Sequence, residues 1–324
     1  MGTMTVARLA QRAIDGDEIE REGLLGLVEA PLEELCDAAD EIRHACCGDR
    51  FELCTIMSVK SGACPEDCRF CAQSARWGGT APRHGFAPAD EIAARARSDA
   101  RRGSQRFSLV ASGERVDADD IGTACEAASA IARETGIGVC ASLGLLDRAD
   151  FDRLRQAGVT RIHNNLETSR SHFGAICTTH SHDRKLEALR AAKDSGLEIC
   201  SGGIVGMGET WGQRVELACE LRALGVDSVP INVLNPIPGT PLQDREPLGI
   251  DEVRRVFAIF RFALPTAALR LAGGRVLLPD AGRSCLRSGA NAAISGDMLT
   301  TAGFDIESDL AMVAKEGLST GTLP

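Results

Sequence analysis

The most informative stretch of this 324-residue sequence is Cys64-Pro65-Glu66-Asp67-Cys68-Arg69-Phe70-Cys71. Its three cysteines follow a C-x3-C-x2-C spacing, which brings three thiolates close together in the chain. Three such thiolates can hold three irons of a cubane iron–sulfur cluster. No fourth cysteine stands near them in the sequence, so one iron of the cluster would stay open to another ligand.

Other uses of these cysteines fit the spacing less well. Structural zinc sites usually take four ligands in paired C-x2-C units, and the three-residue gap between Cys64 and Cys68 departs from that pattern. Three thiols this close cannot all pair in disulfide bonds. The whole chain holds 13 cysteines, and Met1–Glu18 lacks the apolar core of a signal peptide. These features indicate a reducing compartment and metal or redox chemistry, so we expect a cytoplasmic protein.

The composition narrows the classes of function. With 44% hydrophobic residues, the chain can bury a large core in one large domain or two small ones. Its net charge of −10 argues against nucleic acid as a main partner, because phosphate binding needs a basic surface. No apolar run approaches the ~18 residues that a membrane-spanning helix needs, so we expect no membrane partner.

Residues 51–302 repeat one pattern, in which a helical run is followed by a glycine and then by a β-rich run. Such joints stand at Gly103, Gly136, Gly158, Gly196 and Gly225. A glycine after a helix supplies the left-handed residue that ends it. Repeated strand–helix units predict a parallel sheet, and eight of them fit a (β/α)8 TIM-type barrel. We place the strands at 52–59, 105–111, 137–143, 160–166, 197–204, 227–233, 267–271 and 291–294.

The two ends of the chain lie outside this repeat. In residues 1–50, the apolar residues of Pro31–Ile42 recur at helical spacing, so we expect an N-terminal helical extension packed on the barrel. Residues 303–324 form a C-terminal tail that begins acidic, and its last segment, Gly317–Pro324, is expected to fray. No low-complexity linker divides the chain, which therefore reads as one domain with two extensions.

Alternate residues of the predicted strands are polar, although barrel interiors are normally filled by Val, Ile and Leu. Strand residues two apart point to the same side, so every second residue of a strand belongs to one face. The apolar face would pack against the helices, and the polar face would point into the barrel. The alternative is a scatter of hydrogen-bonded core residues. The polar set is Cys54, Ser108, Cys140, Ser142, His163, Asn165, Glu167, Cys200, Ser228, Asn232 and Arg270.

Five stretches resemble the biotin synthase family of the radical S-adenosylmethionine (SAM) superfamily: Ser61–Ser74, Asn165–Ser169, Cys200–Gly206, Val229–Asn232 and Gly239–Leu242. They occur in the family's order, and the resemblance runs from about residue 51 to about residue 302. It implies a sulfurtransferase that inserts sulfur into dethiobiotin to form biotin. It also implies SAM as a co-substrate, an electron donor such as flavodoxin or ferredoxin, and a homodimer.

The same resemblance implies two iron–sulfur clusters. A [4Fe-4S] cluster on Cys64, Cys68 and Cys71 would bind and cleave SAM. An auxiliary cluster deep in the barrel would donate the sulfur, and its family ligands match Cys140, Cys200 and Arg270. It would be either a [2Fe-2S] cluster or a four-iron form with an extra sulfide, a choice that the sequence leaves open.

One auxiliary ligand of the best-known members does not match. This chain has Ser108 where they carry cysteine, and it has Cys54 on the first strand where they usually carry serine. Neighbouring strands lie about 4.8 Å apart, so a thiol moved between them could still reach one cluster. We therefore predict that Cys54 replaces the missing ligand. The alternative is that Cys54 is an ordinary buried cysteine and the auxiliary cluster is lost.

The resemblance also assigns the substrate sites. Ala111, Ser112, Gly113 and Glu114 would contact the methionine end of SAM, and Glu167 would bind its ribose, where aspartate is usual. Gly202 and Ile204 would pack on the adenine, although their glycine-rich run also fits a tight turn at a strand end. Asn165 and Asn232 would hydrogen-bond the cyclic urea of dethiobiotin.

Three other functions stay open on the sequence. The chain could be a hydrogenase maturase or methylornithine synthase type of radical SAM enzyme, a relative that has lost sulfur insertion, or a two-cluster electron-transfer protein. The cysteines without a matching motif are expected to be core or surface thiols. They are Cys36, Cys46, Cys47, Cys125, Cys177, Cys219 and Cys285.

Overall fold

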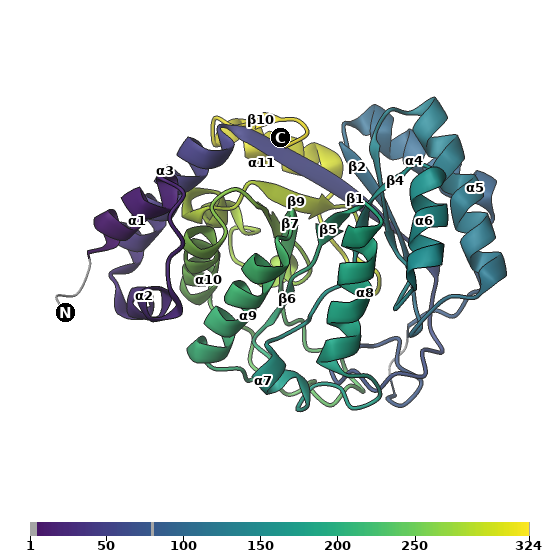
Figure 1. Cartoon of the computed structure of the whole chain (residues 1–324), viewed down its shortest axis with the longest axis horizontal. Coiled ribbons are helices and arrows are strands. Elements are labelled where there is room, and N and C mark those ends of the chain that lie inside the picture. The colour runs from purple at the N-terminus through teal and green to yellow at the C-terminus, as the bar shows by residue number, and fades with distance from the viewer. Residues whose placement is uncertain (1–4, 79–80, 324) are drawn as a thin grey trace.

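The computed structural model describes residues 5–78 and 81–323, and a closed barrel of parallel strands forms its centre (Figure 1). Strand β1 pairs with both β2 and β9, which closes the barrel, and each pairing between its strands is parallel. The predicted (β/α)8 fold is confirmed. The strands are β1 (Arg50–Lys60), β2 (Arg106–Ala111), β3 (Gly138–Ser142), β4 (Val159–His163), β5 (Glu198–Cys200), β6 (Gly203–Val205), β7 (Ser228–Val233), β8 (Ala268–Leu271) and β9 (Ala292–Ser295).

The fifth barrel strand, predicted as continuous over 197–204, is split into β5 and β6. The break occurs at Gly202, which lies against the next strand so closely that a Cβ there would sit 2.0 Å from the carbonyl oxygen of Pro230. Only glycine permits this approach. The close contact lets β6 pair with β7 while its backbone turns toward the barrel mouth.

Helices cover the outside of the barrel, as Figure 1 shows. Thr210 and Gln213 form a capping box that starts α9, and Gly103 ends α4 with a left-handed φ of 107°. Two short 3-10 helices replace an α-helix between β8 and β9, namely η2 (Arg275–Leu277) and η3 (Arg283–Ser288). The helices that follow β1 to β7 are α4 (Ala89–Arg102), α5 (Ala118–Glu134), α6 (Arg148–Gln156), α7 (Arg170–Phe173), α8 (His182–Asp194), α9 (Trp211–Leu224) and α10 (Ile250–Ala263).

The N-terminal extension is helical, as expected. Its elements are α1 (Val6–Ile14), α2 (Arg21–Gly26), η1 (Leu27–Glu29) and α3 (Leu32–Cys47), of which α3 contains the predicted helix. Figure 1 shows these helices at the left of the view, beside α10. Leu35 and Ile42 of α3 are fully buried, and Arg254 of α10 forms an ion pair with Glu33 at 2.7 Å. The extension therefore adds to the core on the outer face of the barrel.

The C-terminal segment differs from the prediction that it frays. Helix α11 (Ile306–Lys315) follows β9, and β10 (Ser319–Thr320) pairs in parallel with the start of β1. The Ser319 N–H donates to the Asp49 carbonyl at 2.9 Å. This pairing forms because β1 begins before the barrel does and leaves a free edge there. Pro324 lies outside the described residues.

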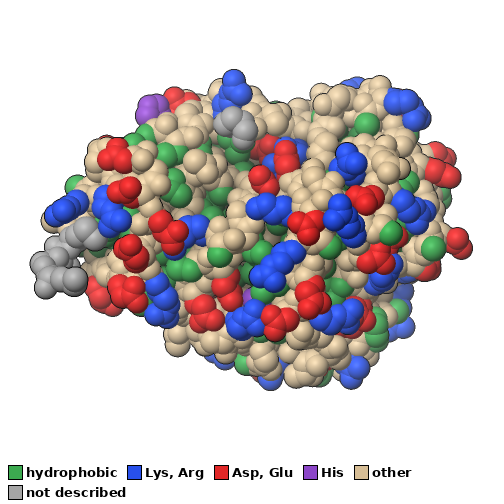
Figure 2. Space-filling model, viewed as in Figure 1, with side chains coloured by type: hydrophobic (Ala, Val, Ile, Leu, Met, Phe, Trp, Pro, Cys, Tyr) green, Lys and Arg blue, Asp and Glu red, His purple; other side chains and the backbone are tan. Residues whose placement is uncertain are grey.

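Along the barrel strands, apolar side chains that point outward alternate with polar side chains that point inward, as predicted. The outward set packs under the helices and is at most 3% exposed: Leu53, Phe107, Leu109, Val139, Ile162, Leu166, Ile199, Val229, Ile231, Leu269 and Leu271. On the face seen in Figure 2, acidic and basic side chains are intermixed. Within residues 5–78 and 81–323, no helix combines the length and apolar character needed to cross a membrane.

Candidate active site

A cavity of about 390 Å³ fills the barrel and extends to the loops at the carboxyl ends of the strands. This is the end at which barrel enzymes place their active sites. Among the described residues, nearly every predicted site residue lines it. They are Cys54, Cys64, Cys68, Cys71, Ala111, Ser112, Gly113, Glu114, Cys140, Asn165, Glu167, Cys200, Ile204, Asn232 and Arg270. Gly202 is the exception, because its backbone is held against β7.

The three-cysteine loop follows β1 and turns its thiols into the cavity mouth. The Cys64 N–H donates to the Gln73 carbonyl at 3.0 Å, which closes the loop on itself. Against the raising effect of burial, backbone N–H groups of Gln73 and Ser74 lower the pKa of Cys71 in part, and those of Glu66 and Gly113 lower the pKa of Cys64 in part. Backbone N–H groups near the sulfurs stabilise cluster thiolates, so the donor set fits an iron–sulfur cluster with Cys68 as the third ligand.

Burial raises the pKa of the Cys71 thiol to about 11 and that of Cys64 above its ordinary value. Both thiols are therefore protonated near neutral pH while they are free. Binding a metal must displace these protons, which couples cluster assembly to pH.

A second loop, which the sequence reading missed, packs against these cysteines. Cys177 follows α7, and its sulfur lies 3.8 Å from that of Cys68. The hydrogen bond from Cys68 and a further one from His180 lower the pKa of Cys177 to about 4. Cys177 was expected to be a core or surface thiol. The C-x2-H spacing of Cys177 and His180 was the available signal for a ligand pair.

The end of β2 forms one wall of the mouth. The Ser112 N–H donates to the Lys60 carbonyl at 2.9 Å, and its hydroxyl donates to the Gly62 carbonyl at 3.0 Å. Gly113 follows with a φ of 113°, which keeps its backbone close to the cysteine loop. The Glu114 carboxylate forms an ion pair with Arg184 of α8, so that its charge is already balanced.

Glu167 is held in an uncommon backbone conformation at the opposite wall, with a φ of 68°. Its carbonyl accepts a hydrogen bond from the Ile204 N–H at 2.8 Å. Burial raises the pKa of Glu167, while the nearby charge of Lys185 lowers it in part. Lys185, another lining residue that the sequence reading missed, donates to Asn164 at 3.1 Å. A buried carboxylate on a strained backbone inside a cavity is typical of a ligand site.

The two predicted substrate asparagines tie strand ends together. The Gly202 N–H donates to Asn165 at 3.0 Å. The Asn232 amide donates to the Gly203 carbonyl at 3.1 Å and accepts from the Gly273 N–H at 2.9 Å. Each amide keeps further hydrogen-bonding capacity, because an asparagine side chain has two N–H donors and two acceptor lone pairs. Both can therefore position the backbone and face a ligand.

Three cysteines line the deeper part of the cavity. Interaction between the buried thiols of Cys54 and Cys140 raises the pKa of Cys54 and lowers that of Cys140 to about 6. The Cys200 sulfur lies 3.4 Å from Nδ1 of His163. Ser108 faces the same space and is in register with Cys140, whereas Cys54 is in register with residue 106. The Cys54 thiol on β1 therefore enters the cavity at a level two strand residues deeper than the Ser108 hydroxyl on β2.

Below the cysteines, one buried carboxylate forms ion pairs with three guanidinium groups. Glu52 is fully buried and lies 2.9 Å from Arg106, 3.1 Å from Arg161 and 2.5 Å from Arg270. Burial would raise the pKa of Glu52, but the charges of Arg270, Arg161 and Arg106 outweigh it and lower the pKa to about 2. The floor of the cavity therefore carries a net positive charge.

We predict that Glu52→Gln destabilises the fold by about 3–5 kcal/mol, because it leaves buried guanidinium groups without their counter-charge. Urea unfolding of the anaerobic protein measures the change. Since the pKa of Glu52 is depressed from 4.5 to about 2, its stabilisation is complete above pH 4.5 and is lost as the pH falls toward 2.

Glu198→Gln is the matched control, because Glu198 contacts Arg106 and Arg161 but its side chain is 43% exposed. An exposed pair of this kind contributes at most about 1 kcal/mol. Equal losses of stability in Glu198→Gln and Glu52→Gln would contradict a special role for the buried carboxylate.

Comparison with known proteins identifies the family. The family model "Radical SAM superfamily" matches residues 58–221, and "Biotin and Thiamin Synthesis associated domain" matches residues 230–319. Biotin synthase of Brachyspira hyodysenteriae is 47% identical over 97% of this chain and 94% of that protein. Biotin synthase 2 of Corynebacterium diphtheriae is 49% identical over 97% of this chain and 95% of that protein. The chain belongs to the biotin synthase family.

Solved structures support the fold of this biotin synthase family member. A methylornithine synthase superposes with a TM-score of 0.84 at 21% identity, covering 97% of both chains. A maturase of the [FeFe]-hydrogenase gives 0.83 at 15% identity, covering 98% of this chain and 75% of that one. These identities are low, so the likeness concerns the barrel alone. The full-length relatives favour the biotin synthase reading over the maturase and methylornithine synthase types.

Proposed function

We propose that this chain is a radical SAM sulfurtransferase that inserts sulfur into dethiobiotin to form biotin. One observation carries the proposal: a single cavity connects the Cys64 loop at its mouth with Cys54, Cys140 and Cys200 at its depth. A site for SAM cleavage and a site for sulfur storage would thus face one substrate. The relatives named biotin synthase support this assignment over nearly their whole length.

At the mouth, Cys64, Cys68 and Cys71 would hold a [4Fe-4S] cluster. When bound, that cluster supplies the electron that cleaves SAM to methionine and a 5′-deoxyadenosyl radical. The chain's part is to orient SAM and to exclude water and other hydrogen donors. Ser112 and Gly113 would present backbone groups to the methionine end of SAM, beside Ala111 and Glu114.

The adenosine end of SAM would lie between β4 and β6. The Glu167 carboxylate would accept hydrogen bonds from the ribose hydroxyls, and its strained backbone fixes the direction in which it points. Ile204 lines the cavity and would pack on the adenine. Gly202 would act indirectly, because its contact with Pro230 shapes the strand break that presents Ile204.

At depth, Cys54, Cys140 and Cys200 would hold the auxiliary iron–sulfur cluster, either [2Fe-2S] or a four-iron form with an extra sulfide. When bound, that cluster supplies the sulfur atom. Arg270 was predicted as a fourth ligand. Its guanidinium already donates to the Glu52 carboxylate at 2.5 Å and to the Ala293 carbonyl at 3.0 Å. A protonated guanidinium is a poor ligand, so we propose that Arg270 mainly balances the cluster's charge.

We predict that Asn165→Ala and Asn232→Ala each weaken dethiobiotin binding by about 1–3 kcal/mol, because each removes a hydrogen bond inside a desolvated cavity. SAM binding should weaken much less. Equilibrium binding of both ligands to the cluster-loaded protein measures the difference. Equal losses for the two ligands would mean that the asparagines serve only to tie the strand ends together.

We also propose a cytoplasmic homodimer that receives electrons from a flavodoxin or a ferredoxin. The dimer and the electron donors rest on the family relationship, and the cytoplasmic location rests on the 13 free cysteines. Size-exclusion chromatography with light scattering measures the oligomeric state, and reduction of the loaded protein by each purified donor compares their rates.

The test of the function is anaerobic turnover of the reconstituted protein with dithionite, SAM and dethiobiotin. We expect biotin, together with two molecules of 5′-deoxyadenosine for each biotin. Formation of 5′-deoxyadenosine without biotin would identify a radical SAM enzyme with another substrate. Iron analysis adds the cluster content: about four irons per chain indicate one cluster, about six a two-iron auxiliary cluster and about eight a four-iron auxiliary cluster.

A further inference from the structure

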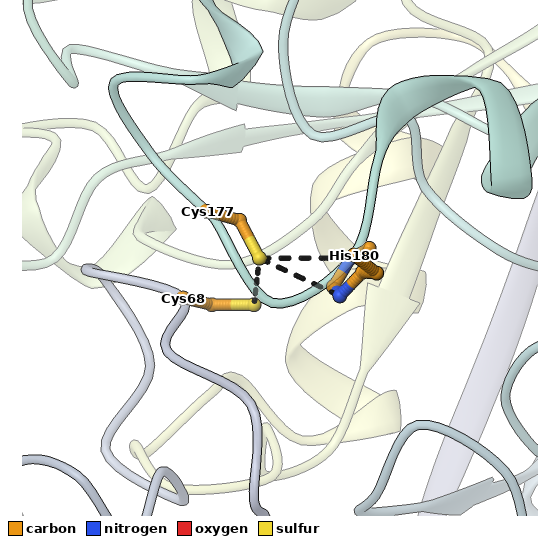
Figure 3. Close-up of side chains that lie close together, drawn as sticks. All are labelled: Cys68, Cys177 and His180. Atoms are coloured by element: carbon orange, nitrogen blue, oxygen red, sulfur yellow. Dashed lines mark hydrogen bonds between the residues drawn. The ribbon is translucent and has the colours of Figure 1, made fainter.

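Three metal-binding side chains converge at the cavity mouth in a combination that the function above does not use. They are Cys68, Cys177 and His180, and Figure 3 shows them pointing toward one another from two separate loops. One ligand atom from each lies within 4.8 Å of the others. Cys177 is buried, whereas Cys68 and His180 are partly exposed at the cavity mouth. The group is therefore a partly buried pocket of soft and borderline donors.

The separations of Cys177 from the other two donors are close to those of a tetrahedral metal site. The two sulfurs are 3.8 Å apart. The Cys177 sulfur lies 3.8 Å from Nε2 of His180 and 3.4 Å from its Nδ1. A tetrahedral ion with metal–sulfur bonds of about 2.3 Å and metal–nitrogen bonds of about 2.0 Å separates two sulfurs by about 3.8 Å, and sulfur from nitrogen by about 3.5 Å. The pocket thus needs little rearrangement to close on an ion.

A carboxylate orients the histidine in the way that metal sites require. Glu66 contacts Nδ1 of His180, which leaves Nε2, 3.8 Å from the Cys177 sulfur, as the ring nitrogen available to an ion. The Thr179 hydroxyl donates to the same Glu66 carboxylate at 2.6 Å and fixes it in turn. Histidine ligands of metals commonly donate their other ring N–H to a carboxylate, which sets the tautomer and strengthens the ligand. This contact is independent of the distances between the ligand atoms.

The loop that carries Cys177 and His180 is fastened to the cysteine loop by its backbone. Asp67 accepts from the Thr178 N–H at 2.8 Å, and the Asp67 N–H donates to the Thr179 hydroxyl at 3.1 Å. The Asp67 carboxylate also lies 3.3 Å from the Cys177 sulfur and adds negative charge beside the pocket. The ligands are therefore held together before any ion binds, which lowers the entropic cost of binding.

We infer that the cluster-free chain binds one divalent transition-metal ion at Cys68, Cys177 and His180. Two thiolates and an imidazole favour zinc among the common divalent ions, with water in the fourth position. Binding releases to solvent any proton that a ligand still carries, and it leaves the oxidation state of the metal unchanged.

The inferred site shares Cys68 with the cluster that cleaves SAM. One thiolate cannot serve both, so the ion and the [4Fe-4S] cluster exclude each other, and zinc delays cluster assembly until it is displaced. This second step rests on the proposed function, because it requires Cys68 to be a cluster ligand. The binding of the ion does not.

The test uses the full chain with Cys64→Ser and Cys71→Ser, so that the cluster cannot form while Cys68 remains. Anaerobic titration with Co²⁺ should give one tetrahedral site with sulfur-to-cobalt charge-transfer absorption, and the Zn²⁺ form should show two sulfur ligands by X-ray absorption. In this background, Cys177→Ser and His180→Gln should each weaken Co²⁺ binding at least about 10-fold. Thermal unfolding checks that each variant is folded.

Cys219→Ser is the matched control, because Cys219 is a half-buried thiol on α9 outside the pocket, and it should leave the titration unchanged. Metal bound by the three deep cysteines is common to all variants and cancels in the comparison. A Cys177→Ser titration identical to that of its parent would overturn the inferred site.

Mutual exclusion is tested separately in the chain with all its cysteines. Zinc should slow iron–sulfur reconstitution of that chain, and Cys177→Ser should remove the delay. If the ion binds as described but zinc leaves reconstitution unaffected, the ion site stands, and the assignment of Cys68 to the cluster is contradicted instead.

Discussion

Replacing Cys64 or Cys71 with alanine is expected to reduce 5′-deoxyadenosine formation to the level seen without enzyme. Each change removes one of three thiolates that hold the SAM-cleaving cluster, and a cubane held by two protein ligands is not retained. The measurement is 5′-deoxyadenosine released from SAM under dithionite, beside iron content per chain. Full activity in either variant would contradict the cluster assignment.

Cys68→Ala is also expected to be inactive, and it is the most informative of the three variants. Cys177 lies 3.8 Å from Cys68, so a replacement thiol is at hand. Its loop is fastened to Asp67, however, and its sulfur faces His180. Residual cleavage in Cys68→Ala that vanishes in the double variant Cys68→Ala/Cys177→Ala would show that Cys177 can enter the cluster. Cys125→Ala, a helical thiol remote from the cavity, controls for general loss of cysteine.

The barrel was predictable because its signals are local. A glycine that ends each helix and a short β-rich run that follows are both readable within a few residues. Strand β7 spans Ser228–Val233 against the predicted 227–233, and β8 spans Ala268–Leu271 against 267–271. The pairing of β10 with β1 was not predictable, since its partner lies about 270 residues away in the chain and nothing in Gly317–Pro324 specifies that edge.

The site residues on the strands were predictable wherever the alternation of inward and outward side chains was followed. Cys54, Ser108 and Cys140 share an inward face, and the structure places all three on the cavity. Glu52 and Arg106 stand two residues before Cys54 and Ser108, so the same rule pointed to them as well. They were overlooked because a charged residue at a strand start is usually solvated. In this barrel the strand starts meet beneath the cavity, where opposite charges replace water.

Contacts between loops were the least predictable part. Cys68 and Cys177 are 109 residues apart, and Glu66 and His180 are 114 apart. Short-range spacing identifies ligands only when they share one loop, as Cys64, Cys68 and Cys71 do. A site assembled from two loops becomes visible only once the fold brings them together.

The arginines beneath the cavity determine which charge is favoured at the proposed auxiliary site. Glu52 offsets one of three buried guanidinium charges, and the half-exposed Glu198 offsets another in part. The surplus positive charge favours anions directly above it. Three cysteine thiolates with a cluster are such an anion. Together with the Cys54 thiol, the same charges lower the pKa of Cys140 to about 6, so this environment favours anionic sulfur, as cluster binding requires.

The proposed replacement of a ligand at Ser108 by Cys54 leads to the prediction with the sharpest outcome. Cys54→Ser is expected to abolish biotin formation while leaving SAM cleavage largely intact. Cys54 lines the cavity together with Cys140 and Cys200, so its removal would leave only two thiols for the proposed deep cluster. The cluster at the mouth keeps all of its ligands. Ser108→Ala should be mild, because in this interpretation Ser108 only packs beside the cluster.

The measurements are biotin per chain, 5′-deoxyadenosine per chain, iron content and Mössbauer spectra of Cys54→Ser, Ser108→Ala and the parent protein. Cys54→Ser should lose the irons of the deep cluster, and Ser108→Ala should keep them. Arg270→Met separates the two roles of its guanidinium: a charge-balancing residue leaves part of the turnover, whereas an essential ligand leaves none. If Cys54→Ser retains the second cluster and makes biotin while Ser108→Ala loses both, the serine site holds the cluster and the replacement did not occur.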